Sequence, residues 1–139
     1  MLGDEIGHSS GAVTGIRVLE GHVMEVSFRG QGALLEVPIT DLGTYLQTVT
    51  PDGMIHGDDS HVVMLTEDGE AAKWWGFGIG KPTGPGFTSS WGVAGTFETT
   101  SSKLARLNST ATVVEYEVGE NGEYRWKMWE WTGASGSGQ

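Results

Sequence analysis

Residues 109–132 read STATVVEYEVGENGEYRWKMWEWT, and this stretch decides the fold because its charges determine which side chains point outward. Apolar and polar residues alternate on both sides of Glu120-Asn121-Gly122, as in a β-hairpin. A three-residue loop with Gly122 in the left-handed conformation makes opposite charges face each other on the outer side. The expected outer pairs are Glu117 with Arg125, Glu115 with Lys127, and Val113 with Trp129. A two-residue loop would place Glu117 against Trp126 and mix the two faces.

The same register predicts which side chains of this hairpin point into the protein. The expected inward pairs are Val118 with Tyr124, Tyr116 with Trp126, Val114 with Met128, and Thr112 with Glu130. All but the last pair are apolar or aromatic, so this face is a core face. Glu130 is then a carboxylate that points inward.

Strand patterns continue through most of the remaining sequence. We expect further strands at residues 7–19, 22–35, 40–50, 54–66, 70–81 and 87–99. Two more loops, Pro51-Asp52-Gly53 and Glu67-Asp68-Gly69, share the chemistry of the last one, so the same three-residue register is applied to them. The segment 100–108, TSSKLARLN, is expected to form one or two helical turns.

These elements predict an all-β domain, a closed eight-stranded antiparallel up-and-down barrel with one short helix before the seventh strand. Eight strands suffice for closure around side chains or one small ligand, and closure removes the edge strands. A two-sheet sandwich is the alternative, which the short sequential hairpins disfavour. The domain is expected to cover residues 1–132, with a flexible Gly/Ser tail at residues 133–139.

Inward faces elsewhere follow from the loop register. For the hairpin 54–81, the predicted inward set is Asp58, Ser60, Val62, Met64, Ala72, Trp74, Gly76 and Gly78. For the strand 40–50 the pattern leaves two options: either Tyr45 and Gln47, or Thr44 and Leu46, point inward.

Composition limits the classes of function. Eighteen acidic and eight basic side chains give a net charge of −10, which disfavours nucleic acid and anionic membrane surfaces as partners. Cysteine is absent, which excludes disulfides and thiolate metal sites. The N-terminus lacks the features of a secretion signal and no apolar run approaches the ~20 residues of a membrane span, so a cytoplasmic location is expected. The four histidines show no metal-binding spacing, and neither a metal nor a cofactor is expected.

Several short sequence segments resemble segments of known proteins. They are VTG at 13–15 with RVL at 17–19, GTY at 43–45, MLTEDGE at 64–70, SKLARLN at 102–108 and WEW at 129–131. On the basis of these segments, the chain resembles a group of small uncharacterised bacterial proteins. At the level of shape, the expected barrel is also similar to the allene oxide cyclase, dirigent and spirotetronate cyclase barrels. That likeness implies apolar ligands in the lumen and transfers no catalytic residue.

The inward carboxylates are the candidate catalytic groups. Glu130, beside aromatic residues, could exchange protons with a substrate as general acid or base, and Asp58 could act as its partner. His56 shares the parity of Asp58, so we expect it at the same barrel mouth as a ligand contact. The alternatives are that Glu130 is a solvated rim carboxylate, that Asp58 is a bend residue and that His56 is a solvated neighbour of the turn.

Large inward residues are the candidate ligand contacts. The expected set comprises Tyr45, His56, Trp74, Trp91, Phe97, Tyr116, Trp126 and Met128. The small residues Ser60, Ala72, Gly76 and Gly78 fill little volume on the facing strands, which favours a cavity. The alternative is that the aromatic rings simply fill the core.

Three functions are compatible with this pattern. The first is binding of a small, mostly apolar molecule in the lumen, and the second is a cofactor-independent isomerase, cyclase or lyase in the same cavity. The third is a structural barrel with a packed lumen and no ligand. Outward Trp129 and Trp131, with Trp75 and Phe77, form an apolar patch that predicts a homodimer.

Overall fold

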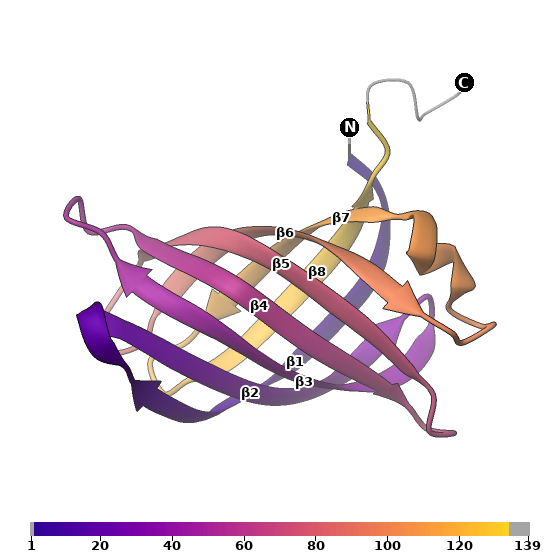
Figure 1. Cartoon of the computed structure of the whole chain (residues 1–139), viewed down its shortest axis with the longest axis horizontal. Helices are drawn as coiled ribbons and strands as arrows, with labels where there is room; N and C mark the ends of the chain where they lie inside the picture. Colours follow the sequence, from indigo (N-terminus) through magenta and orange to yellow (C-terminus); the bar gives the residue numbers. More distant parts are fainter. Residues whose placement is uncertain (1, 134–139) are drawn as a thin grey trace.

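The computed structural model describes residues 2–133, which form a closed antiparallel barrel of eight strands in sequential order (Figure 1). This confirms the predicted fold class. The strands are β1 (Leu2–Val18), β2 (Val23–Leu34), β3 (Val37–Val49), β4 (Ile55–Thr66), β5 (Ala71–Pro82), β6 (Ser89–Thr99), β7 (Ala111–Val118) and β8 (Glu123–Trp131). β8 pairs with β1 and closes the sheet. Beyond Gly133, the predicted tail lies outside the described residues.

The three glycine-ended loops have the predicted register. Gly53, Gly69 and Gly122 adopt φ values of 84°, 87° and 88°, a conformation that glycine reaches without steric cost. In the last loop the Gly119 amide donates to the Glu123 carbonyl at 2.7 Å. Every predicted pair of the final hairpin is present, from Val118 opposite Tyr124 to Thr112 opposite Glu130. The charge pattern therefore identified the inner and outer faces of β7 and β8 correctly.

The β2–β3 turn was not predicted. Leu34 pairs with Val37, so Leu35 and Glu36 alone form the turn, with φ values of 49° and 67°. Two left-handed residues are the geometry of a type I′ turn, whose usual residues are Asn and Gly. Because neither is present here, the pattern gave no turn signal, and β3 begins three residues before its predicted start.

A β-bulge in β4 corrects the predicted face of Asp58. The pairing with β5 is interrupted between Gly57 and Ser60, and Asp59 has a φ of 53°. The additional residue reverses the inside–outside alternation, so Gly57 takes the place opposite Gly78 that the regular register assigned to Asp58. Asp58 is exposed on the outer wall, and the prediction that it points inward was wrong.

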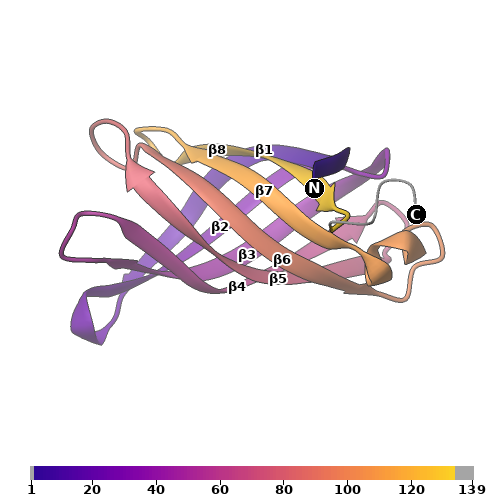
Figure 2. The same cartoon turned by 90° about the horizontal axis from the view of Figure 1, so that it is seen from above.

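The two ends of the barrel differ. At one end the 3₁₀ turn η2 (Ala105–Ser109) follows β6, and the side chains of Leu104 and Leu107 are fully buried there (Figures 1 and 2). The Asn108 carboxamide joins η2 to β6, accepting from the Thr99 amide at 2.8 Å and donating to its carbonyl at 3.0 Å. The predicted short helix is thus a 3₁₀ turn that covers part of this end, here called the covered end.

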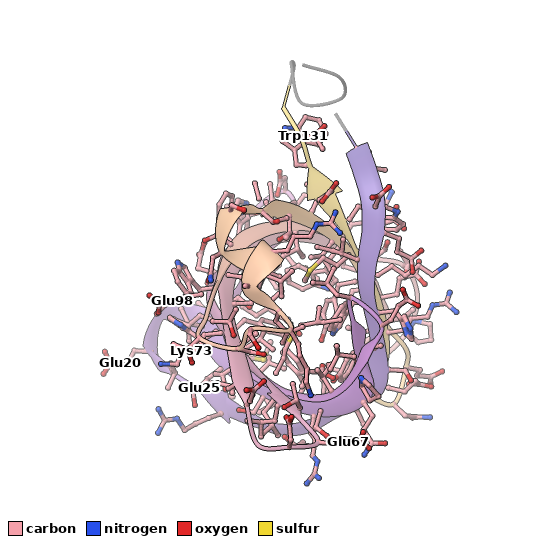
Figure 3. All side chains as sticks on the ribbon, turned by 90° about the vertical axis from the view of Figure 1, so that its right-hand side faces the viewer. Glu20, Glu25, Glu67, Lys73, Glu98 and Trp131 are labelled. Carbon is pink, nitrogen blue, oxygen red and sulfur yellow. The ribbon has the colours of Figure 1, made fainter. Side chains whose placement is uncertain are left out.

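Among residues 2–133, the opposite end carries only connecting segments and is here called the open end. They are the β1–β2 connection, which contains the 3₁₀ turn η1 (Glu20–His22), and the β3–β4, β5–β6 and β7–β8 loops (Figure 1). Viewed from the covered end, charged side chains such as Glu25, Lys73 and Glu98 lie outside the wall (Figure 3). No helix within residues 2–133 has the length and apolarity needed to cross a bilayer.

Candidate functional site

The predicted lumen aromatics are inside the barrel. Seven of the eight predicted ligand contacts are buried: Tyr45, Trp74, Trp91, Phe97, Tyr116, Trp126 and Met128. The exception is His56, which precedes inward Gly57 and pairs with outward Ile79, so the prediction that it points into the barrel was wrong. The β4 bulge is again the reason, because it reversed the parity of both His56 and Asp58.

Glycines in the wall accommodate aromatic rings. A Cβ atom on Gly57 or Gly80 would lie 2.8 or 2.4 Å from the Trp91 ring. Gly76 has the same relationship with Trp74, whose ring would be 2.7 Å from an added Cβ. These distances are below normal van der Waals contact, so the indoles occupy the space that the glycines leave. The sequence argument that small residues keep the lumen open was therefore wrong for Gly76.

The central lumen consequently contains little free space. Its cavity measures about 60 Å³ and lies between Trp74, Trp91, Tyr116 and Trp126. This volume is far below the roughly 300 Å³ or more of most ligand pockets.

A cluster of aromatic side chains, here called the floor, lies between this cavity and the open end of the barrel. Tyr45 and Tyr116 meet with their hydroxyl oxygens 3.3 Å apart, and Trp91 packs edge-on against both rings. Burial raises the pKa of both tyrosines above the usual value of 10.0, so both hydroxyls are protonated at neutral pH. The floor thus offers neutral hydroxyls and no charge.

A larger cavity lies at the open end, above this floor. It measures about 270 Å³, and Tyr45 lines both it and the central cavity. The open-end cavity is lined by residues of β1 to β7: Val13, Ile16, Met24, Val26, Tyr45, Gln47, Val49, Ile55, Pro82, Gly86, Phe87, Thr88, Ser89 and Val118. Most are apolar and none is charged. Apart from Tyr45, sequence reasoning missed this site, although Gln47 belonged to one of the two faces considered for β3.

The β5–β6 loop forms one side of the open-end cavity and is held by its own hydrogen bonds. The Thr88 hydroxyl donates to the Pro85 carbonyl at 2.6 Å. Ser89 donates to the Phe87 carbonyl at 3.1 Å and accepts from the Trp91 indole at 2.9 Å. This loop is therefore a hydrogen-bonded wall of the cavity.

The two predicted catalytic carboxylates are not brought together. Glu130 is at the covered end, where its carboxylate pairs with Arg106 Nη2 at 2.5 Å and its side chain is 17% exposed. Asp58 is on the outside of the wall. Glu130 therefore matches the rim carboxylate considered as its alternative, with Arg106 of η2 as its partner.

Sequence reasoning missed the buried carboxylate of Asp41. Its side chain is fully buried and accepts hydrogen bonds from the Ser9 hydroxyl, the Tyr124 hydroxyl at 2.7 Å and the Trp126 indole at 3.2 Å. Asp41 has the same strand parity as Tyr45, so choosing the Tyr45 face of β3 would have placed it inward. It lines neither of the two cavities and joins β3 to β1 and β8. No group of three or more His, Asp or Glu side chains within residues 2–133 is placed to hold a metal ion.

Neither a protein-family model nor a curated protein matches the chain. Solved structures of bacterial proteins share its fold. A protein of unknown function from Clostridium acetobutylicum ATCC 824 superimposes with a TM-score of 0.78 at 17% identity, over 91% of this chain and 96% of that one. A conserved protein of unknown function from Rhodopseudomonas palustris has a TM-score of 0.75 at 13% identity, over 94% and 98% of the two chains. A β-barrel-like protein from Acinetobacter baumannii AYE has a TM-score of 0.75 at 16% identity, over 94% of each chain.

Proposed function

We propose that the barrel binds a small, mostly apolar molecule in the open-end cavity. The observation that carries this proposal is the 270 Å³ cavity with its apolar, uncharged lining. Mouths of β-barrels are frequent ligand sites, and apolar walls with a few polar groups are typical of them. The shape-level likeness to allene oxide cyclase, dirigent and spirotetronate cyclase barrels, which work on apolar ligands, also supports the proposal.

The proposed position is different from the central lumen expected from the sequence. The central cavity of about 60 Å³ is too small, whereas the open-end cavity is more than four times larger. An apolar cavity of about 150 Å³ is known to bind benzene. A ligand of roughly eleven non-hydrogen atoms therefore fits the open end on the same scale.

Filling the cavity tests this proposal. Val118 is 6% exposed and lines the cavity from β7, so Val118→Phe places a ring inside it. Val113→Phe is the matched control, because Val113 points outward on the same strand opposite Trp129. Naphthalene binding is measured by isothermal titration calorimetry or saturation-transfer NMR. We expect wild type and Val113→Phe to bind naphthalene and Val118→Phe to bind it at least tenfold more weakly. Equal binding by all three proteins, or none by wild type, would refute the open-end site.

An acid/base isomerase, cyclase or lyase activity of Glu130 and Asp58 remains a prediction. Glu130 lies at the rim of the covered end and Asp58 on the outer wall, and the ion pair with Arg106 already engages Glu130. No feature of the open-end cavity supplies a charged acid or base. Binding therefore takes precedence over catalysis in the proposal.

A second candidate function is self-association through the outer wall. Trp131 is 49% exposed and stands out from the barrel at the end of β8 (Figure 3). Trp129 is half-buried on the same outer face. We expect Trp131→Glu to shift a dimer toward monomer in sedimentation equilibrium. Ile79→Glu is the control at an exposed apolar residue outside the predicted patch, with 50% exposure on β5, and should leave the dimer unchanged.

A further inference from the structure

Gln47 is the one side chain of the open-end cavity whose hydrogen-bonding groups are unused. It faces inward from β3, two residues after Tyr45, between Met24 of β2 and Gly57 of β4. Within residues 2–133, its carboxamide has no hydrogen-bond partner. A primary amide offers two donors and one acceptor, so Gln47 can serve either kind of ligand group.

The other polar side chains of the cavity already have partners. The Thr88 and Ser89 hydroxyls donate to carbonyls of their own loop, and Ser89 also accepts from Trp91. The Tyr45 hydroxyl is paired with that of Tyr116. The Gln47 carboxamide is therefore the group of the cavity that is best placed to hydrogen-bond a ligand.

Charge around the cavity disfavours an anionic ligand. None of the lining residues is charged. The four connections at the open end, residues 19–22, 50–54, 83–88 and 119–122, carry Glu20, Asp52 and Glu120 but no Lys or Arg. A carboxylate in the cavity would lose its hydration without gaining a cationic partner, and the acidic rim would repel it. An ammonium ion would be attracted to the rim but would also find no counter-charge inside.

Resting on the proposed function, we infer that the open-end cavity selects neutral molecules with one hydroxyl or carbonyl group, which pairs with the Gln47 carboxamide. The rest of the ligand, roughly ten non-hydrogen atoms by the volume argument above, packs against Val26, Ile55 and Val118. Gln47 is then the residue that determines specificity, while the apolar walls supply most of the affinity.

The test compares ligands that share one ring system and differ in one group. The probes are naphthalene, 2-naphthol, which is neutral at pH 7, 2-naphthoate and 2-naphthylmethylammonium. Their Kd values are measured for wild type, Gln47→Leu, Gln47→Met and the control Gln31→Leu, since Gln31 is exposed on β2. Thermal melting followed by circular dichroism establishes that each variant is folded, and the two Gln47 variants provide independent tests.

Loss of the hydroxyl preference is the expected result. The ratio of the naphthalene Kd to the 2-naphthol Kd should fall about threefold to tenfold in Gln47→Leu and Gln47→Met, the range of one hydrogen bond. It should be unchanged in Gln31→Leu. Wild type should bind 2-naphthoate and the ammonium probe at least tenfold more weakly than 2-naphthol.

The outcomes separate this inference from the proposed function. If naphthalene binds but the ratio is the same in wild type and both Gln47 variants, the role of Gln47 is refuted and the open-end site stands. The same conclusion holds if the anion or the cation binds best. If no probe binds wild type, the proposed function itself fails.

Discussion

The Tyr124 hydroxyl donates a 2.7 Å hydrogen bond to the Asp41 carboxylate, joining β8 to β3 inside the barrel. These strands are separated by β1 and β2 in the sheet. Gly30 of β2 makes the approach possible, because a Cβ atom there would lie 2.3 Å from the Tyr124 oxygen. The buried carboxylate thus has donors from two other strands, β1 and β8, and links non-neighbouring parts of the wall.

Removing that hydroxyl should destabilise the barrel. Tyr124→Phe deletes a hydrogen bond to a charged, fully buried group, which contributes about 1.5–3 kcal/mol. Tyr116→Phe is the matched control, because it deletes a neutral hydroxyl pair worth about 0.5–1.5 kcal/mol. Urea unfolding measures both free energies. An equal or smaller loss for Tyr124→Phe would show that the Asp41 network does not contribute in this way.

The glycines beneath the indoles should tolerate no side chain. Gly80→Ala places a methyl group 2.4 Å from the Trp91 ring and should cost about 1–3 kcal/mol of unfolding free energy through overpacking. Gly92→Ala is the control, because nothing lies within 4 Å of an added Cβ there and alanine restricts the unfolded chain. Thermal unfolding followed by near-ultraviolet circular dichroism measures both. Similar melting temperatures for the two variants would contradict the packed-ring interpretation.

Alkaline pH should unfold the protein cooperatively. All three tyrosines of the chain, Tyr45, Tyr116 and Tyr124, are buried, and burial raises the pKa of each in the folded state. For Tyr124 the hydrogen bond to Asp41 adds to this increase in pKa. Because the unfolded tyrosines titrate near pH 10.0, the folded state retains more protons above that pH. This contribution to stability is complete below pH 10 and decreases as the pH rises above it.

The measurement is the phenolate absorbance at 295 nm together with far-ultraviolet circular dichroism. Phenolate absorbance should appear only with unfolding, at a pH above 10. A gradual titration with a midpoint near pH 10 and an unchanged circular dichroism spectrum would mean that the three hydroxyls reach solvent in the folded protein.

The ion pair at the covered end should anchor η2. Glu130→Gln removes the charge that Arg106 contacts and should cost about 1 kcal/mol, since the carboxylate is largely shielded. Glu117→Gln, which breaks the more exposed pair with Arg125, is the control and should cost less. Hydrogen exchange of the Leu107 and Thr110 amides, which donate to the Leu104 and Leu107 carbonyls within this turn, should accelerate only in Glu130→Gln. Equal exchange rates of these two amides in both variants would show that the ion pair does not anchor η2.

The sequence alone determined the register of the last hairpin. Glu117 and Arg125 show why. An opposite-charge pair on the outer face and a glycine-ended loop favour one pairing, and slipping it by one residue would place Glu117 against Trp126 and mix the two faces. These effects are local, because they depend only on residues within one hairpin. Because the loops 51–53 and 67–69 follow the same rule, the antiparallel barrel and its inward aromatics were predictable.

Only the tertiary structure decided where free space lies and which carboxylate is buried. The β4 bulge has Asp59, not a glycine, in the left-handed conformation, so the sequence carried no signal for it, and the bulge turned Asp58 outward. The rings of Trp74 and Trp91 then filled the space over the wall glycines, while η2 covered one end and left the other open. The size of a cavity is the small difference between the volume that the barrel encloses and the volume that its side chains fill. Strands far apart in the chain contribute to both volumes, so no local sequence pattern specifies a cavity.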